Sequence, residues 1–128
     1  MKPLLLDTDV MVDILREYPP AIAWYDALEE LPTTSCFTVM ELLGGSKNKS
    51  EFARIQQWLL DFPILYPIMT DLEFASFQLT PYCLSHGVGL LDLLIASVAV
   101  GHDLTLATFN MKHFRSIPNL QIIQPYRK

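Results

Sequence analysis

The sequence has little of what would indicate a disulfide scaffold, a zinc site or a membrane segment. Its 128 residues include two cysteines, Cys36 and Cys83, in apolar surroundings and without CxxC spacing, so neither a zinc site nor a redox pair is expected. The first apolar run ends at Asp7 after three leucines, which predicts neither a signal peptide nor a membrane anchor. The apolar stretch 93–101 is shorter than the roughly 20 residues that cross a bilayer. These absences predict a soluble, cytoplasmic protein.

Hydrophobic residues make up 51% of the chain, which predicts a substantial core. The length is too short for two domains of ordinary size. The sequence has no repeat, low-complexity segment or linker. We therefore expect residues 1–128 to form a single domain.

Short apolar segments with strand character alternate with helical patterns along the chain. The predicted strands are 2–6, 33–37, 64–66, 104–107 and 120–123. The predicted helices are 10–15, 20–31, 38–43, 51–62, 70–85, a segment around Asp92, and 111–114. Ser50 and Thr70 are the expected N-caps of two of these helices, and Gly44-Gly45 is expected to stop a third. The alternation predicts an α/β fold, with a central parallel β-sheet that carries helices on both faces and binds ligands at the carboxyl ends of its strands.

Three separated segments each carry one acid in an apolar setting. Asp92 is the only charge in residues 88–101, Glu41 is the only charge in residues 31–46, and Asp7 ends a run of leucines. An unpaired buried carboxylate is costly and normally faces a cation, a metal or strong donors. Each acid alone has an ordinary explanation, such as a helix cap, a solvent-facing position or an arginine partner.

Taken together, the three acids suggest one site at the carboxyl edge of the sheet. Asp7 follows one predicted strand, and Thr108 and Asn110 follow another. If the helices bearing Glu41 and Asp92 begin beside this edge, the three acids converge and repel one another unless divalent cations neutralise them. Oxygen ligands, few histidines and no thiolate cluster favour Mg²⁺ or Mn²⁺ over zinc. Such a site suits phosphodiester or phosphate chemistry.

Four motifs, in this order and spacing, resemble the PIN domains, and within that superfamily the VapC-type toxins of bacterial toxin–antitoxin pairs. The motifs are LLLDTDVMVDIL, TVMELLGG, GVGLLDLLIASVAV and LTLATFNMKHF. The resemblance covers nearly the whole chain. It implies a PIN-like fold over residues 1–128 and a Mg²⁺-dependent endoribonuclease that hydrolyses RNA phosphodiester bonds with a metal-activated water.

The resemblance assigns the acidic catalytic positions of the family to four residues: Asp7, Glu41, Asp92 and Asn110. Asp7 and Asp92 are the implied metal ligands, and the hydroxyls of Thr8 and Thr108 are implied to help place metal or water. Asn110 departs from the family pattern. Its carbonyl oxygen can hold a water or a metal but adds no negative charge, so we expect one Mg²⁺ ion rather than two. Outside this set, Asp9 is the expected N-cap of the first helix, and Asp13 is expected to approach the site or to face water.

The implied partners are RNA, a small antitoxin that inserts a peptide into the acidic cleft, and a second copy of the chain in a homodimer. The net charge is −5, and the three proposed acidic ligands account for more than half of it. RNA affinity would therefore depend on local basic residues. The candidates for phosphate contact are Arg16, Lys47 and Lys49. Apolar surface around Trp24 and Leu28 is expected to serve the homodimer or the antitoxin.

Two other classes remain open. The start LLLDTDV also matches the Asp-x-Asp motif of haloacid-dehalogenase-type phosphatases, which are metal-dependent, although no Gly-Thr or lysine motif follows and the chain is short. Alternatively, the domain binds RNA or a partner without cutting, and Asn110 marks a degenerated site. Among the histidines, His113 lies nearest the site in sequence and is expected to have a capping or packing role.

Overall fold

Five short parallel strands form the centre of the protein. The computed structural model describes residues 3–128, and within them one sheet has the order β3-β2-β1-β4-β5 with every neighbouring pair parallel. The strands are β1 (Leu4–Leu6), β2 (Thr33–Ser35), β3 (Ile64–Leu65), β4 (Thr105–Ala107) and β5 (Gln121–Ile123). Each of the five predicted strands is present and shorter than predicted; residue 2 lies outside the described residues. The predicted parallel sheet is confirmed.

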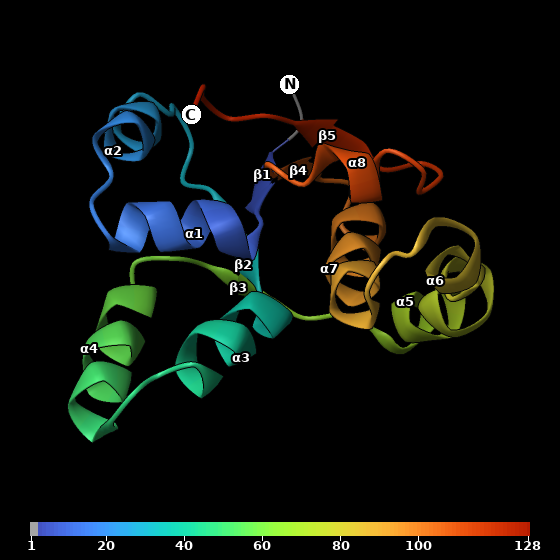
Figure 1. The fold of residues 1–128 in the computed structure, drawn as a ribbon, viewed down its shortest axis with the longest axis horizontal. Helices are drawn as coiled ribbons and strands as arrows, with labels where there is room; N and C mark the ends of the chain where they lie inside the picture. Colours follow the sequence, from blue (N-terminus) through green and yellow to red (C-terminus); the bar gives the residue numbers. More distant parts are fainter. Residues whose placement is uncertain (1–2) are drawn as a thin grey trace.

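Helices cover both faces of this sheet. They are α1 (Thr8–Leu15), α2 (Pro19–Asp26), α3 (Cys36–Gly44), α4 (Lys49–Leu59), α5 (Met69–Phe74), α6 (Pro81–His86), α7 (Leu90–Gly101) and α8 (Met111–Phe114), with a π-helical segment, Ala75–Leu79, between α5 and α6. Figure 1 shows α1, α2 and α4 on one side of the strands and α5, α6 and α7 on the other. A bilayer-spanning helix is absent from residues 3–128, since none of their helices combines sufficient length and apolarity.

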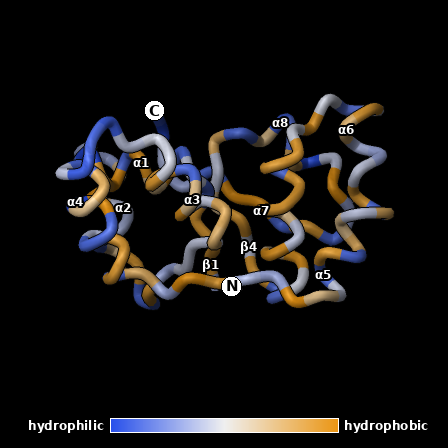
Figure 2. Tube along the Cα trace, turned by 90° about the horizontal axis from the view of Figure 1, so that it is seen from below, coloured by the Kyte–Doolittle hydropathy of each residue, from blue (hydrophilic) through white to orange (hydrophobic). Residues whose placement is uncertain are grey.

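The central strand β1 contributes to two hydrophobic cores because successive side chains of a strand point to opposite faces. Leu5 packs in the core that includes Ile95 of α7. Leu6 packs in the other core, with Met11 of α1 and Leu59 of α4. Figure 2 shows hydrophobic segments of the chain along both sides of β1 and β4. Because β1 is buried on both faces, its ends are held in fixed positions. The residue that follows the strand, Asp7, is therefore held in a fixed position as well.

Several helix boundaries differ from the predictions for local chemical reasons. Asn48, not Ser50, caps α4, because its Oδ1 atom accepts from the backbone N–H of Glu51 at 2.8 Å. The predicted helix 70–85 starts at Met69 and is divided by the π-helical segment and by Pro81, which cannot donate the next helical hydrogen bond. The helix predicted as 20–31 ends at Asp26, and a turn leads the chain toward β2. The Gly44-Gly45 stop of α3 is confirmed.

The C-terminal segment forms a strap over α1 and α2. The hydroxyl of Tyr126 donates to Asp13 of α1 at 2.7 Å, and the Lys128 ammonium lies 2.8 Å from the same carboxylate. Lys128 also lies over the ring of Phe109 at 4.4 Å, and Tyr126 packs against Trp24 with ring centroids 6.0 Å apart. Tyr126 and Lys128 therefore connect α1, α2 and the segment that follows β4.

The sequence suggested exposed apolar surface around Trp24 and Leu28, but the structure places the most exposed apolar side chains elsewhere. Trp24 and Leu28 are partly buried against the core that contains Leu6, so the expected apolar surface on the first helices is largely covered. The most exposed large apolar side chains lie in the π-helical segment and in α6, where Phe77 is 79% and Leu84 is 94% exposed. These positions lie on the opposite side of the sheet from α2 (Figure 1).

Candidate functional site

The carboxyl ends of β1 and β4 bring Asp7 and Thr108 together. Leu6 is opposite Ala107 in the parallel register, so the next residue of each strand lies at the same edge of the sheet. The chain leaves β1 toward β2 on one side while β4 lies on the other, and such a switch point is where α/β sheets bind ligands. The Thr108 hydroxyl donates to Asp7 Oδ2 at 2.7 Å, and the Thr8 N–H donates to Asp7 Oδ1 at 2.8 Å. Both carboxylate oxygens are therefore held in place.

The Asp7 carboxylate is buried, and its pKa is raised. It is only 5% exposed. Burial, together with the smaller effects of the Asp9 and Asp92 charges, raises its pKa to about 7, against the opposing effect of the donors Thr108 and Thr8. Hydrogen bonds alone thus do not compensate for the negative charge, and a cation at this position would.

A chain of hydroxyl groups leads from β2 to Glu41. Ser35, the N-cap of α3, donates to the Thr38 hydroxyl at 3.4 Å, and Thr38 lies 3.0 Å from the Thr8 hydroxyl. Thr8 donates its one hydroxyl hydrogen to Glu41 Oε1 at 2.5 Å, so Thr38 must be the donor to Thr8. Ser35 and Thr38 are fully buried. Sequence reasoning missed both, although serine is a preferred N-cap residue where a strand leads into a helix.

Asp92 lies in the first turn of α7, where Asn110 and His113 contact it. The Asn110 Nδ2 atom donates to Asp92 Oδ2 at 3.2 Å and also lies 2.9 Å from His113 Nδ1. Since an amide nitrogen only donates, His113 Nδ1 accepts the second hydrogen. His113 Nδ1 is 3.7 Å from Asp92 Oδ2. Burial raises the pKa of Asp92, and the hydrogen bond from the Asn110 amide opposes the rise.

The two neighbours of Asp92 bear on two expectations. The amide nitrogen of Asn110 faces Asp92, which suits a carboxylate neighbour, and the expected role of its carbonyl oxygen as a ligand for a water or a metal stays a prediction. We expected a capping or packing role for His113, but its ring contacts Asn110 and Asp92 instead. Sequence reasoning missed this contact because His113 follows Asn110 by three residues in a helical turn, a spacing that many packing residues share.

One further hydrogen bond joins the two halves of the site. The Asn110 N–H donates to the Thr108 hydroxyl at 3.0 Å. A continuous network therefore contains all six predicted catalytic and supporting residues: Asp92, Asn110, Thr108, Asp7, Thr8 and Glu41. However, no three Asp, Glu, His or Cys side chains within residues 3–128 are close enough to hold one metal ion. We expected the three acids to converge on one point; instead, hydroxyl and amide groups separate these mutually repelling charges.

The other two acids of the first motif have structural partners. Asp7, not Asp9, is the N-cap of α1, so the predicted cap was wrong. Asp9 accepts from the backbone N–H of Phe109 at 3.0 Å and thereby ties α1 to the segment after β4. Burial is the largest cause of a raised pKa for Asp9. Asp13 neither approaches the site nor faces water freely, because Tyr126 donates to it.

The structure separates the three candidates for phosphate contact. Arg16 and Lys47 line a groove of about 570 Å³ that also includes Thr8, Glu41 and Arg54. Lys49 is exposed at the start of α4 and does not line this groove.

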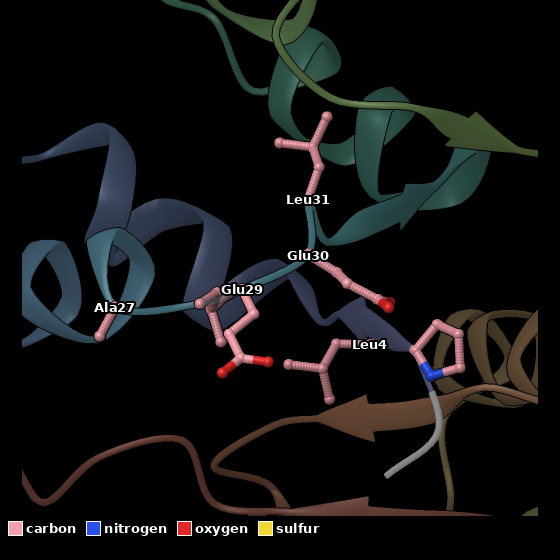
Figure 3. Close-up of a pocket in the computed structure, with 7 residues that line it drawn as sticks. Leu4, Ala27, Glu29, Glu30 and Leu31 are labelled. Carbon is pink, nitrogen blue, oxygen red and sulfur yellow. The ribbon is translucent and has the colours of Figure 1, made fainter.

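A second cavity, of about 500 Å³, lies at the other end of β1 (Figure 3). Its lining includes Leu4, the first residue of β1, whereas Asp7 follows the last residue of that strand. Its acidic side chains are Glu29 and Glu30, both exposed, and no residue of the hydrogen-bonded network lines it. This cavity is therefore separate from the candidate site.

The fold and the site define an α/β protein with carboxylates, hydroxyls and one amide gathered at the switch point of a parallel sheet. The chain belongs to the PIN-domain family, whose model, described as PIN domain, matches residues 4–120. The resemblance inferred from the four sequence motifs is confirmed.

Curated relatives and solved structures are similar over almost the whole chain. Ribonuclease VapC10 of Mycobacterium tuberculosis is 31% identical over 121 residues, covering 92% of this chain and 90% of that protein. Ribonuclease VapC19 of the same organism is 32% identical over 124 residues, covering 91% and 96%. The crystal structure of VapBC2 from Rickettsia felis bound to a promoter DNA fragment matches with a TM-score of 0.79 and 26% identity, covering 94% and 96%. The chain is thus related to VapC ribonucleases.

Proposed function

We propose that this protein is a Mg²⁺-dependent endoribonuclease and the toxin of a VapBC-type toxin–antitoxin pair. The observation that carries the proposal is the continuous hydrogen-bonded network at the switch point, which includes the buried Asp7 carboxylate with its raised pKa. The relatives named ribonuclease VapC10 and VapC19 support the activity. The substrate is RNA, and the match of the family model to residues 4–120 supports a single PIN domain over the chain.

PIN-domain ribonucleases are generally metal-dependent, and the residues of this site suit one Mg²⁺ ion, with Mn²⁺ as the alternative. Asp7 and Asp92 would be its protein ligands. Two carboxylates are sufficient because Mg²⁺ usually keeps several waters and takes phosphate oxygens as further ligands. When bound, the ion would lower the pKa of a water and offset the charge that develops on the phosphate.

The remaining residues of the network have positioning roles in this proposal. Thr108 orients Asp7, and Asn110 orients Asp92 through its amide nitrogen. Thr8 holds one oxygen of Glu41 and leaves the other, on an exposed side chain, available to a water or to the substrate. Glu41 would therefore act from the solvent side of the site, opposite the buried Asp7.

A small antitoxin and a second copy of the chain are the proposed protein partners. The relatives of known structure include complexes described as toxin–antitoxin and VapBC complexes, from Klebsiella pneumoniae and Rickettsia felis. The exposed apolar side chains of Phe77 and Leu84 are candidates for one of these interfaces. A cytoplasmic location would suit an enzyme that acts on cellular RNA.

Cleavage of RNA by purified protein tests the proposal. We expect cleavage in Mg²⁺ that EDTA stops, and a loss of at least about 100-fold in Asp92→Asn, because the substitution removes one charged ligand. Asp61→Asn changes an exposed carboxylate outside the network and is the matched control. Retention of cleavage in Asp92→Asn would contradict the assignment of this site.

A non-catalytic RNA-binding or partner-binding domain is the second candidate. One observation favours it, since Asn110 offers a hydrogen-bond donor to Asp92 where the family has an acid. If the wild-type protein binds RNA but cuts none of a broad set of transcripts in either Mg²⁺ or Mn²⁺, this second candidate replaces the first.

A further inference from the structure

A groove leads away from Glu41 between α1, α3 and α4. Basic side chains from three different segments line it: Arg16 at the end of α1, Lys47 in the loop before α4, and Arg54 in α4. Its apolar lining consists of Val12, Leu15, Leu42 and Ile55. We propose that this groove binds single-stranded RNA, with the three basic side chains on phosphates and the apolar lining against a base. The proposal rests on the ribonuclease function and specifies how that site receives its substrate.

The charges of the groove favour an anionic ligand. None of Arg16, Lys47 and Arg54 forms an ion pair with a carboxylate within residues 3–128. The two acids of the groove already accept from neutral donors, Glu41 from the Thr8 hydroxyl and Glu51 from the Lys47 backbone N–H at 3.3 Å. The three positive charges therefore remain available to a polyanion, although the chain as a whole carries −5.

The position of the groove connects it to the network. Thr8 and Glu41 line one end of the groove, and Thr8 is the residue that joins Glu41 to Asp7. A strand that lies in the groove would thus reach the carboxylates without a change in the fold. Arg54 is the additional contact that sequence reasoning did not select, because it lies far from the motifs and only the packing of α4 brings it there.

The mixture of charge and apolar surface favours single-stranded RNA over a duplex. Single strands present spaced phosphates together with unstacked base faces, whereas a duplex hides its bases. None of the residues that line the groove is aromatic. The base contact should therefore be a weak aliphatic one with little preference for a particular base, and most of the affinity should depend on salt.

Binding measurements with a variant that cannot cut RNA test the groove directly. The probe is a fluorescein-labelled oligouridine of about 12 nucleotides, titrated with full-length Asp92→Asn protein while anisotropy is followed at several salt concentrations. Adding Arg16→Ala, Lys47→Ala and Arg54→Ala together should weaken binding at least about tenfold. It should also reduce the slope of log K against log salt by about 2, since each phosphate contact on a single strand contributes about 0.7.

The matched control is Arg115→Ala, which removes one exposed positive charge outside the groove. Added to the Asp92→Asn parent, it should leave the affinity for oligouridine within about twofold of the parent at the same salt concentration. A single exposed charge outside the groove contributes little. A triple variant that binds like this control overturns the proposal, and so does a parent protein that binds no oligouridine at low salt. A triple variant that keeps its RNA affinity but no longer co-purifies with a co-expressed partner protein assigns the groove to that partner and also overturns the proposal.

Cleavage assays separate this proposal from the proposed function. If wild-type protein cleaves RNA in Mg²⁺ and the triple variant cleaves like Arg115→Ala, the groove proposal fails and the ribonuclease function stands. If wild-type protein cleaves nothing while the triple variant loses RNA binding, the groove stands and the ribonuclease function fails. Where both hold, the triple variant should raise KM at least about tenfold with a smaller change in kcat, because the groove binds the substrate before and during the reaction alike.

Discussion

Replacement of Asp7 by asparagine should stabilise the metal-free protein at neutral and alkaline pH. Asp7 is 5% exposed, and its pKa is raised from 3.8 to about 7. The folded protein therefore binds the Asp7 proton more tightly than the unfolded chain does, and stability falls as pH rises from about 4 to about 7. The difference in pKa corresponds to about 4 kcal/mol of lost stability above pH 7.

The asparagine side chain removes this charge and keeps most of the polar contacts. Its oxygen can accept from the Thr8 N–H, and its nitrogen can donate to the Thr108 hydroxyl, which reverses one hydrogen bond. The reversal costs about 1 kcal/mol. We therefore expect Asp7→Asn to be about 3 kcal/mol more stable than wild type at pH 8, and equally or slightly less stable at pH 4.

Urea unfolding in EDTA at pH 4, 6 and 8 measures this difference, and Asp61→Asn is the control for loss of an exposed charge. Added Mg²⁺ provides a second readout, since a ligand at ten times its Kd stabilises the folded protein by about 1.4 kcal/mol. Wild type should gain this stability and Asp7→Asn should not. If both proteins show the same dependence on pH, Asp7 is not an uncompensated buried charge, and if both gain equally from Mg²⁺, Asp7 is not a ligand.

Two further substitutions test the surroundings of the site. Asn110→Asp replaces the donor that lies 3.2 Å from Asp92 Oδ2 with a second carboxylate. It should destabilise the metal-free protein by about 1–3 kcal/mol at pH 8. It should also tighten Mg²⁺ binding, measured by calorimetry, about tenfold or more. Unchanged Mg²⁺ affinity would place the ion away from Asp92. Asp9→Asn should reduce RNA cleavage only mildly, by less than about tenfold, because Asp9 holds the backbone of Phe109. Complete loss of cleavage in Asp9→Asn would instead place Asp9 among the catalytic residues.

The sequence was sufficient to predict the sheet and the edge at which the site lies. Apolar runs that end in polar residues predicted β1 and β4, and parallel strands place their carboxyl ends at one edge. Asp7 and Thr108 could therefore be placed together before the structure was known. The register that sets Leu6 opposite Ala107 could not be predicted, since three-residue strands carry no pattern that fixes it.

The details that the sequence could not provide depend on long-range packing. Asn110 directs its nitrogen, not its oxygen, to Asp92 because a carboxylate faces it across the packed α7 and α8 segments. Thr38 reaches Thr8 only because α3 begins at Cys36, two residues earlier than predicted. Arg54 enters the groove through the packing of α4 against α1 and α3. No local pattern in the sequence encodes any of these neighbours.

The C-terminal strap has a consequence for how the site keeps its geometry. Asp7 and Phe109 belong to segments about a hundred residues apart, and Asp9 provides only one hydrogen bond between α1 and the segment after β4. The Thr108 hydroxyl adds a second link through Asp7. Tyr126 and Lys128 add further contacts, since both bind Asp13 while their side chains pack against Phe109. Tyr126 and Lys128 lie beyond the residues matched by the family model, and through Asp13 and Phe109 they help to fix the position of α1, and so of Asp7, relative to the segment after β4.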